Sequence, residues 1–215
     1  NSLRFNDDDS AYLNWTPSVA GNRKTWTWSG WVKRGYVGSS LKNLFCCDVA
    51  INDADRFQLR LNSDKLYVSG QSTQFLNTNQ LFRDTSAWYN IILAVDTTQA
   101  TSSNRLKIYI NGEQVTSFSA SNYPSQNFEF AINQANRHTL GAGSNIPTVA
   151  NHFDGYLAEV HFIDGQALDP TSFGETGDYG EWKPIEVTGM TYGTNGFYLD
   201  FSNSGSLGTD ASSNT

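Results

Sequence analysis

The stretch His152–Phe173, HFDGYLAEVHFIDGQALDPTSF, decides the fold of this chain. Its middle divides into two alternating sets, with Tyr156, Ala158, Val160 and Phe162 on one face and Leu157, Glu159, His161 and Ile163 on the other. Successive strand side chains point to opposite faces, so the pattern predicts a strand with one wholly apolar side. Asp154-Gly155 and Asp164-Gly165 mark turns at its two ends. Pro170, which has no N–H to donate, follows at a tight corner.

A second alternating strand lies near the start of the chain. One set is Trp26, Trp28, Gly30 and Val32, and the other is Thr25, Thr27, Ser29, Trp31 and Lys33. The two strands are predicted to be inner strands that share one aromatic core. Residues 88–95 are apolar on both faces, which indicates a central strand covered on both sides. Asn111-Gly112 is a strong two-residue turn, and regular strand spacing without βαβ alternation predicts an all-β, two-sheet antiparallel sandwich.

Four segments in a fixed order carry a family resemblance. They are TWTWSGWVKRG (25–35), SAWYNIILAVDTTQ (86–99), RLKIYINGEQV (105–115) and FDGYLAEVHFIDGQAL (153–168). Together they resemble laminin-G-like, concanavalin-A-like lectin domains, and more narrowly the lectin-like modules of tailed-bacteriophage virion proteins. The resemblance implies a jelly-roll sandwich over residues 1–173. It also implies a β-rich C-terminal extension, or the start of a following module, over residues 174–215, whose final YGTNGFYLDFSNSGSLGTDASSNT is similar to the segment after such modules.

The composition of the chain narrows the classes of ligand or partner that it could bind. The net charge of −7 argues against a nucleic acid, because phosphate binding draws on Lys and Arg. No apolar run approaches the roughly 20 residues needed to span a bilayer. Charged residues make up only 16% and aromatic residues 13% of the chain, which suits contact with neutral polar ligands such as sugars and is also common among extracellular β proteins.

Adjacent Cys46 and Cys47 form no disulfide framework and fit a reducing cytoplasm. Because the chain begins with Asn1, we expect a processed product or a piece of a longer protein.

Catalytic chemistry finds little support in the sequence. Jelly-roll glycosidases need two carboxylates across a cleft, but Glu159 has no acid at two-residue spacing. The family resemblance often includes an acid immediately before this position, where Ala158 stands here. His161 beside Glu159 could serve as the base of a polysaccharide lyase, although two such residues on an outward face are more often solvated or paired. We therefore expect that the chain is not an enzyme.

Exposed aromatic side chains are the candidates for sugar binding, because an aromatic face flanked by polar groups is the usual platform. Trp31 comes first, since alternation places it opposite Trp26 and Trp28. The alternative is that a loop or a partner chain covers Trp31. The full predicted set is Trp31, Trp15, Tyr36, Trp88 and Tyr123.

Two acidic clusters are candidates for calcium, a hard cation that prefers oxygen ligands and that related lectin folds commonly hold. One is the turn with Asp7, Asp8 and Asp9, and the other contains Asp48, Asp53 and Asp55. Neither has the spacing of a helix-loop-helix calcium site. Acidic turns that bond to their own backbone are the stronger interpretation.

The resemblance implies a non-enzymatic phage virion protein: a lectin-like module of a tail fibre, capsid fibre or decoration protein. Such a module would contact host-surface glycans or other virion proteins. It would be a homo-oligomer, for instance a trimer, assembled in the host bacterial cytoplasm and located in the virion. The alternatives are a bacterial extracellular carbohydrate-binding module, a packing domain without a ligand, and, less favoured, a jelly-roll glycoside hydrolase or lyase.

Overall fold

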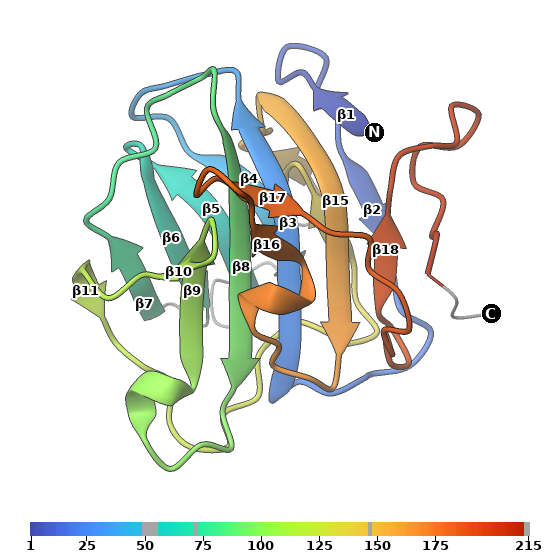
Figure 1. Ribbon diagram of the computed structural model, residues 1–215. Helices are drawn as coiled ribbons and strands as arrows, with labels where there is room; N and C mark the ends of the chain where they lie inside the picture. The colour runs from blue at the N-terminus through green and yellow to red at the C-terminus, as the bar shows by residue number, and fades with distance from the viewer. Residues whose placement is uncertain (49–55, 71–72, 146–147, 213–215) are drawn as a thin grey trace.

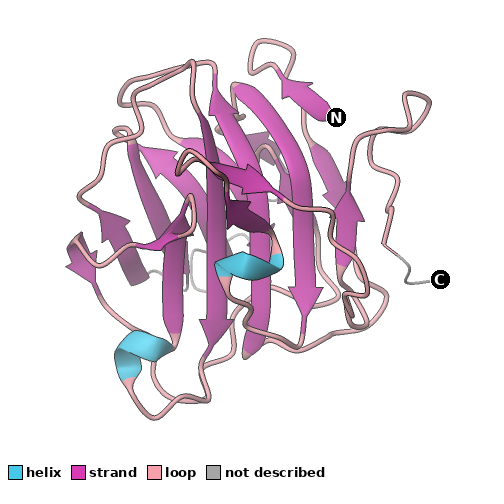
Figure 2. Ribbon diagram, viewed as in Figure 1, coloured by secondary structure: helices cyan, strands magenta, loops and turns pink. Residues whose placement is uncertain are grey.

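The computed structural model describes residues 1–48, 56–70, 73–145 and 148–212. They form two antiparallel β-sheets stacked face to face (Figure 1). Apart from the short 3-10 helices η2 (Ser102–Asn104) and η3 (Pro170–Ser172), the regular structure of the described chain is strand (Figure 2). Neither helix is long or apolar enough to cross a membrane. The predicted all-β jelly-roll sandwich is confirmed.

The first sheet contains both strands that the sequence singled out. Its order is β1 (Ser2–Phe5), β15 (Gly155–Asp164), β3 (Thr25–Arg34), β8 (Trp88–Asp96), β9 (Leu106–Ile110) and β10 (Glu113–Gln114). A further strand, β18 (Phe197–Leu199), pairs with the second half of β15, while β1 pairs with the first half. The first and last strands of this sheet in the chain therefore lie end to end along one edge of β15.

The second sheet packs behind the first. Its order is β11 (Phe118–Ser121), β7 (Thr73–Thr78), β6 (Lys65–Gly70), β5 (Arg56–Asn62), β4 (Lys42–Asp48), β12 (His138–Leu140) and β2 (Leu13–Trp15). Two small hairpins accompany the sandwich, β13 (Gly143–Asn145) with β14 (Thr148–Ala150), and β16 (Gly174–Thr176) with β17 (Trp182–Pro184).

The core between the sheets is largely aromatic. Trp26 of the first sheet meets Phe57 of the second edge to face, with ring centroids 5.3 Å apart. Trp28 lies against Gly30 of its own strand, where a Cβ would come 2.9 Å from the Trp28 ring. Glycine is needed there because the indole occupies the space of a side chain. Val160 and Phe162 join the same core, so the prediction that β3 and β15 share one core is confirmed.

A β-bulge corrects one prediction about β15. The pairing of β15 with β3 shifts between Ala158 and His161, so that two residues of β15 stand opposite one residue of β3. Glu159 is the bulged residue and has a φ of +46°. The extra residue reverses the alternation, so Leu157 faces the core together with Val160 and Phe162. The predicted apolar face is therefore wrong in its first half, because Tyr156 and Ala158 lie on the outer side.

The segment beyond residue 165 covers the outer face of the first sheet (Figure 1). It builds a second, smaller core from Ile92, Ala94, Tyr109, Ile163, Phe173 and Tyr192. Trp182 of β17 anchors the hairpin, since its Nε1 donates to Asn90 Oδ1 of β8 at 3.0 Å. The indole also lies against Gly112, whose φ is +84° in the predicted turn. β8 is thus buried on both faces, which confirms the predicted central strand.

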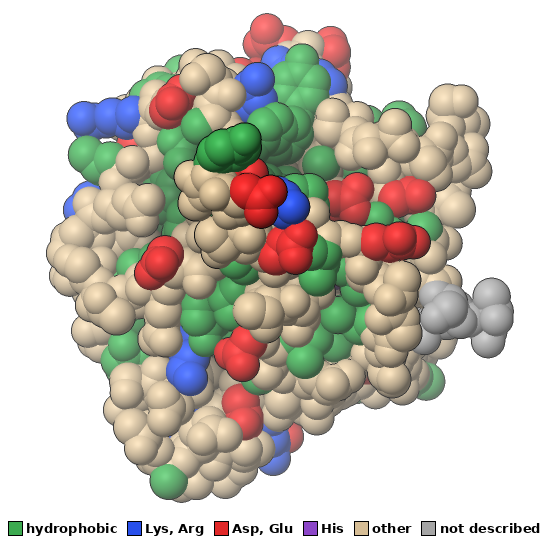
Figure 3. All heavy atoms as spheres, in the orientation of Figure 1, with side chains coloured by type: hydrophobic (Ala, Val, Ile, Leu, Met, Phe, Trp, Pro, Cys, Tyr) green, Lys and Arg blue, Asp and Glu red, His purple; other side chains and the backbone are tan. Residues whose placement is uncertain are grey.

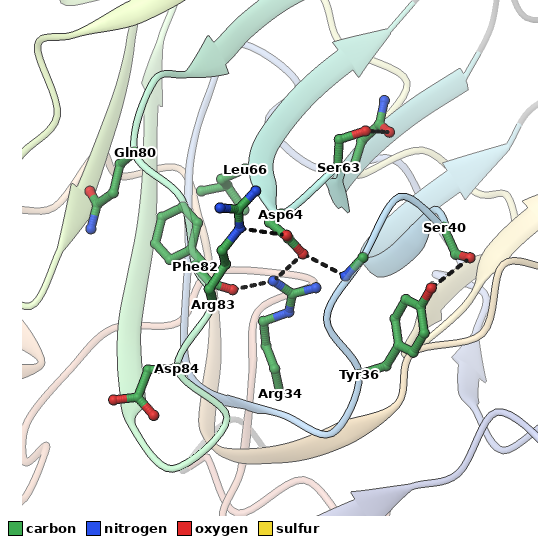
Figure 4. Close-up of polar contacts among 12 residues, drawn as sticks. Arg34, Tyr36, Ser40, Ser63, Asp64, Leu66, Gln80, Phe82, Arg83 and Asp84 are labelled. Carbon is green, nitrogen blue, oxygen red and sulfur yellow. Dashed lines mark hydrogen bonds and ion pairs between the residues drawn. The ribbon is translucent and has the colours of Figure 1, made fainter.

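An ionic network around the buried carboxylate of Asp64 joins the two sheets at one end (Figure 4). Asp64, in the turn between β5 and β6, accepts from Arg34 Nη1 at 3.0 Å, Arg83 Nε at 3.0 Å and Gly38 N at 2.7 Å. Burial raises the pKa of Asp64, but these donors together outweigh burial and hold the pKa below its usual range. Arg34 ends β3, so the network fixes the first sheet to a turn of the second.

Candidate functional site

The outer face of the second sheet presents a polar surface built by alternation. Phe57, Leu59 and Leu61 of β5 point into the core, so the intervening residues of β5 point outward. Register then aligns this outer set across the sheet: Gln58 stands opposite Ser69 of β6, and Arg60 stands opposite Tyr67. The next strand, β7, continues the first of these rows, with Gln74 opposite Ser69.

These side chains line a hollow of about 420 Å³, here called the polar groove. Its described lining residues are Arg56, Gln58, Arg60, Tyr67, Ser69, Gly70, Thr73 and Gln74. The lining contains amides, hydroxyls, two guanidinium groups and one aromatic ring. No carboxylate occurs among these described lining residues.

Arg60 is held in the groove by two neighbouring side chains. Its guanidinium carbon lies 4.5 Å from the centroid of the Tyr67 ring, which is a cation–π contact. Its Nη1 donates to Gln58 Oε1. Its Nε is buried and has no hydrogen-bond partner among the described residues. The guanidinium plane is therefore fixed, while one of its donors has no acceptor.

None of the sequence-predicted aromatic residues lines this groove, so sequence reasoning missed it. The signal was present in the run RFQLRLN (56–62), where polar and apolar residues alternate strictly. Polar residues on the outer face of a strand usually indicate only a solvated surface. What makes a groove here is the lateral alignment of three strands, and alternation within one strand does not contain that information.

Two of the predicted aromatic residues do come together on the other sheet. Trp31 and Trp88 line a hollow of about 300 Å³ on the outer face of the first sheet, with Glu159, Ala158, Pro184 and Asn1. We call it the tryptophan hollow. Trp31 is only 9% exposed, and Trp88 lies 6.5 Å from Tyr156 between ring centroids. The hollow is mostly apolar, and β17 contributes Pro184 to its wall.

The other three predicted aromatic residues lie apart from one another. Trp15 stacks on His138 with centroids 5.1 Å apart and lines a separate hollow of about 320 Å³ with residues of β18. Tyr36 lies under the ammonium group of Lys42, at 5.1 Å. Tyr123 packs partly buried against the main core. These three residues therefore form no common surface.

His161 is held in the smaller core and is 1% exposed. Its Nδ1 lies 2.9 Å from the hydroxyl of Tyr192, and its ring stacks on Tyr198 with centroids 4.3 Å apart. The hydroxyl of Tyr198 donates to Glu159. Burial lowers the pKa of His161 to about 3. The imidazole is therefore neutral and covered by two tyrosines, which is the environment of a packed side chain rather than of a substrate-facing base.

Asp7 and Asp9 in the acidic turn near the start of the chain are engaged by other side chains of the protein. Asp7 forms an ion pair with Lys42, whose hydrogen bond holds the pKa of Asp7 below its usual range although burial opposes it. Asp9 accepts a hydrogen bond from Asn6 Nδ2 at 2.6 Å. Asp8 lies between Asp7 and Asp9 in the sequence. The described residues contain no group of three or more His, Cys, Asp or Glu side chains that could hold a metal ion. Of the second predicted cluster, Asp48 lies in β4, and Asp53 and Asp55 fall outside the described residues.

Two stacked antiparallel sheets, one of which carries a polar groove on its outer face, define a jelly-roll β-sandwich. Residues 7–172 match Laminin_G_3, the Concanavalin A-like lectin/glucanases superfamily. This match covers most of the chain, and the chain belongs to that superfamily. Among curated protein sequences, none matches the chain.

Solved structures share this fold at low sequence identity. A Bacteroides ovatus protein, provisionally described as carbohydrate-binding, superposes with a TM-score of 0.58 and 14% identity over 94% of this chain and 52% of its own. The enzymatically active domain of tailspike protein 2 of bacteriophage CBA120 gives 0.54 and 14%, over 80% of this chain and 26% of its own. A heptameric SAP-like pentraxin from Limulus polyphemus gives 0.51 and 15%, over 73% and 70%. The chain spans about half the length of the Bacteroides protein.

Proposed function

We propose that this chain is a non-enzymatic, glycan-binding module and that the saccharide lies in the polar groove. The observation that carries the proposal is the groove itself, where neighbouring strands align amides, hydroxyls and guanidinium groups around the ring of Tyr67. Sugars are recognised by such sets, in which polar groups bond to hydroxyls and an aromatic ring contacts the sugar's apolar face. The superfamily and the Bacteroides protein of similar fold support this assignment.

Binding without catalysis fits the groove better than hydrolysis or elimination does. Glycoside hydrolysis uses a pair of carboxylates placed across the sugar. The described lining of the groove has no carboxylate. Glu159 lies on the opposite sheet, and His161 beside it is buried. The burial of His161, which the sequence offered as the base of a lyase, supports the proposal that the chain is not a lyase.

We further propose that the module works in a tailed-phage virion, in a fibre or a decoration protein. There it would contact host-surface glycans or neighbouring virion proteins as a homo-oligomer, such as a trimer, assembled in the host bacterial cytoplasm. Support comes from the resemblance of the four segments and from the tailspike domain that shares the fold over 80% of this chain. Genes for capsid and tail proteins beside the full-length gene are the expected finding. A neighbourhood of secreted polysaccharide-degrading enzymes would instead favour a bacterial carbohydrate-binding module.

A glycan array with three proteins tests where the sugar binds. The wild-type chain should bind one class of glycans, and Tyr67→Ala should weaken that binding by about fivefold, because an aromatic contact is worth roughly 1 kcal/mol. Trp31→Ala, in the tryptophan hollow, is the matched variant on the other sheet and should leave affinity unchanged.

Thermal melting of both variants shows whether a loss of glycan binding comes from a lost side-chain contact or from unfolding of the variant. Loss of binding in folded Trp31→Ala, with full binding in Tyr67→Ala, would move the site to the tryptophan hollow. A wild-type chain that binds no glycan on the array would contradict the proposed function itself.

A further inference from the structure

Resting on the proposed function, we infer that the saccharide recognised in the polar groove is acidic, and that Arg60 recognises its carboxylate or sulfate groups. Neutral sugars need hydroxyl-bonding groups but no positive charge. The groove supplies both, and its charge is unlike that of the rest of the chain.

The described lining of the polar groove differs in charge from the chain as a whole. The chain has 21 acidic against 14 basic side chains, a net charge of −7. Acidic side chains are spread across the face formed by the C-terminal segment over the first sheet (Figure 3). The described lining of the polar groove instead holds Arg56 and Arg60 and no acid. Charge of one sign in a concave surface attracts ligands of the other sign.

The geometry of Arg60 suits a ligand with two anionic oxygens. An arginine presents a planar fork that matches the two oxygens of a carboxylate or sulfate. The Tyr67 ring fixes the plane of this fork, and Gln58 Oε1 accepts from Nη1. On the other edge of the fork, Nε has no acceptor among the described residues. A buried donor without an acceptor is costly, and an oxyanion would supply one.

Arg56 extends the positive charge along the same strand. It lies four residues before Arg60, on the same outward face of β5, so the two Cα atoms are roughly 13 Å apart. Two positive groups along a groove suit a polymer with repeated anionic groups better than they suit a single ion. Arg60 carries the specificity, because it is the arginine whose ring contact and hydrogen bond within the groove fix its orientation.

The experiment compares polysaccharides that differ only in charge. One pair is polygalacturonate and its carboxyl-reduced form, and the second pair is a sulfated galactan and its desulfated form. Binding is measured by affinity gel electrophoresis and biolayer interferometry at 20 and 300 mM NaCl. At least one acidic member should bind tenfold or more tightly than its neutral counterpart, and salt should weaken that binding. Whichever pair shows the preference identifies the anionic group.

Variants test whether the preference for the acidic polysaccharide arises in the polar groove. Arg60→Gln should abolish the preference for the acidic member, and Arg60→Lys should retain only part of it, because an ammonium group has charge without the fork. Lys107→Gln, on the first sheet, removes one positive charge elsewhere and should change nothing. If Arg60→Gln does not fold, Arg60→Lys and the wild-type salt dependence still decide the matter.

Each remaining outcome counts against a defined claim. Equal affinity for acidic and neutral members, without an effect of salt, would overturn the acidic-ligand inference and leave glycan binding intact. An unchanged preference in folded Arg60→Gln would overturn the role of Arg60. Failure to bind either pair, or any glycan on the array, would overturn the proposed function together with the inference.

Discussion

His138 and His161 show that burial, rather than the neighbouring residues in the sequence, determines the protonation state of a side chain. His138 Nε2 accepts from the backbone N–H of Asn133 at 2.9 Å, so its ring is held neutral. Burial lowers the pKa of His138 to about 4 and that of His161 to about 3. In the sequence, His161 simply shares a strand face with Glu159. The tyrosines that cover it come from more than 30 residues later, so the sequence could not distinguish a packed histidine from a catalytic base.

Both histidines should make the protein less stable in mild acid. Unfolded, they take up a proton near pH 6.5, whereas folded they stay neutral down to about pH 4 or below. The unfolded state therefore binds protons first, and the free energy of unfolding should fall as pH drops below 6.5. The slope should approach about 1.4 kcal/mol per pH unit for each histidine. Urea unfolding at pH 7.0, 6.0 and 5.0 measures it.

The matched variants are His138→Gln and His161→Gln. Each should lower stability at pH 7 but reduce the slope between pH 6 and 5 by about half. If both variants keep the full wild-type slope, other groups cause the acid sensitivity.

At the scale of elements, the sequence predicted the strands well and missed what interrupts them. Alternation located β3, β8 and β15, and the turn at Asn111-Gly112 was recognised because both residues tolerate a positive φ. The bulge at Glu159 escaped because a glutamate in the middle of an alternating run gives no sign of left-handed backbone. One extra residue was enough to exchange the two faces of the first half of β15.

Deleting Glu159 should be tolerated. Without the bulged residue, Leu157, Ala158 and Val160 follow one another in simple alternation, so Leu157, now fully buried, stays on the core face with Val160. We expect a loss of less than about 2 kcal/mol in the free energy of unfolding, because no buried leucine becomes exposed. Glu159→Gly keeps the residue count and relieves the positive φ, so it should also cost little. Guanidinium unfolding of the two variants measures both losses, and a loss of about 2–5 kcal/mol on deletion, comparable to removing a buried leucine, would mean that the strand needs the bulge to keep Leu157 in the core.

At the scale of the whole molecule, the four recognised segments were sufficient to predict the sandwich, whereas the polar groove was not predictable. Trp31 and Trp88 were chosen as candidates because large aromatic residues stand out in a sequence. Arg60, Gln58 and Tyr67 become one surface only through the pairing of β5 with β6. The covering of the first sheet was also hidden, because residues 174–200 show few regular strands in the sequence.

Truncation tests whether this covering belongs to the fold. A chain ending at Phe173 loses β18 and leaves Ile92, Ala94 and Ile163 of the first sheet open to water. It should melt at a lower temperature than the full chain and bind the dye ANS, because a large apolar patch is exposed. A chain ending at Gly205 keeps β16, β17 and β18 and serves as the control. Equal melting of all three chains would show that residues 174–205 contribute nothing to stability.

The end-to-end arrangement of β1 and β18 along β15 determines which side of the molecule faces away from anything attached to either end of the chain. Both strands lie on one flank of the first sheet, whereas the polar groove opens on the far side of the other sheet. A tether attached before β1 or after β18 would therefore hold the sandwich by its rim. The polar groove would then remain unobstructed on a crowded support, whichever end carried the linkage.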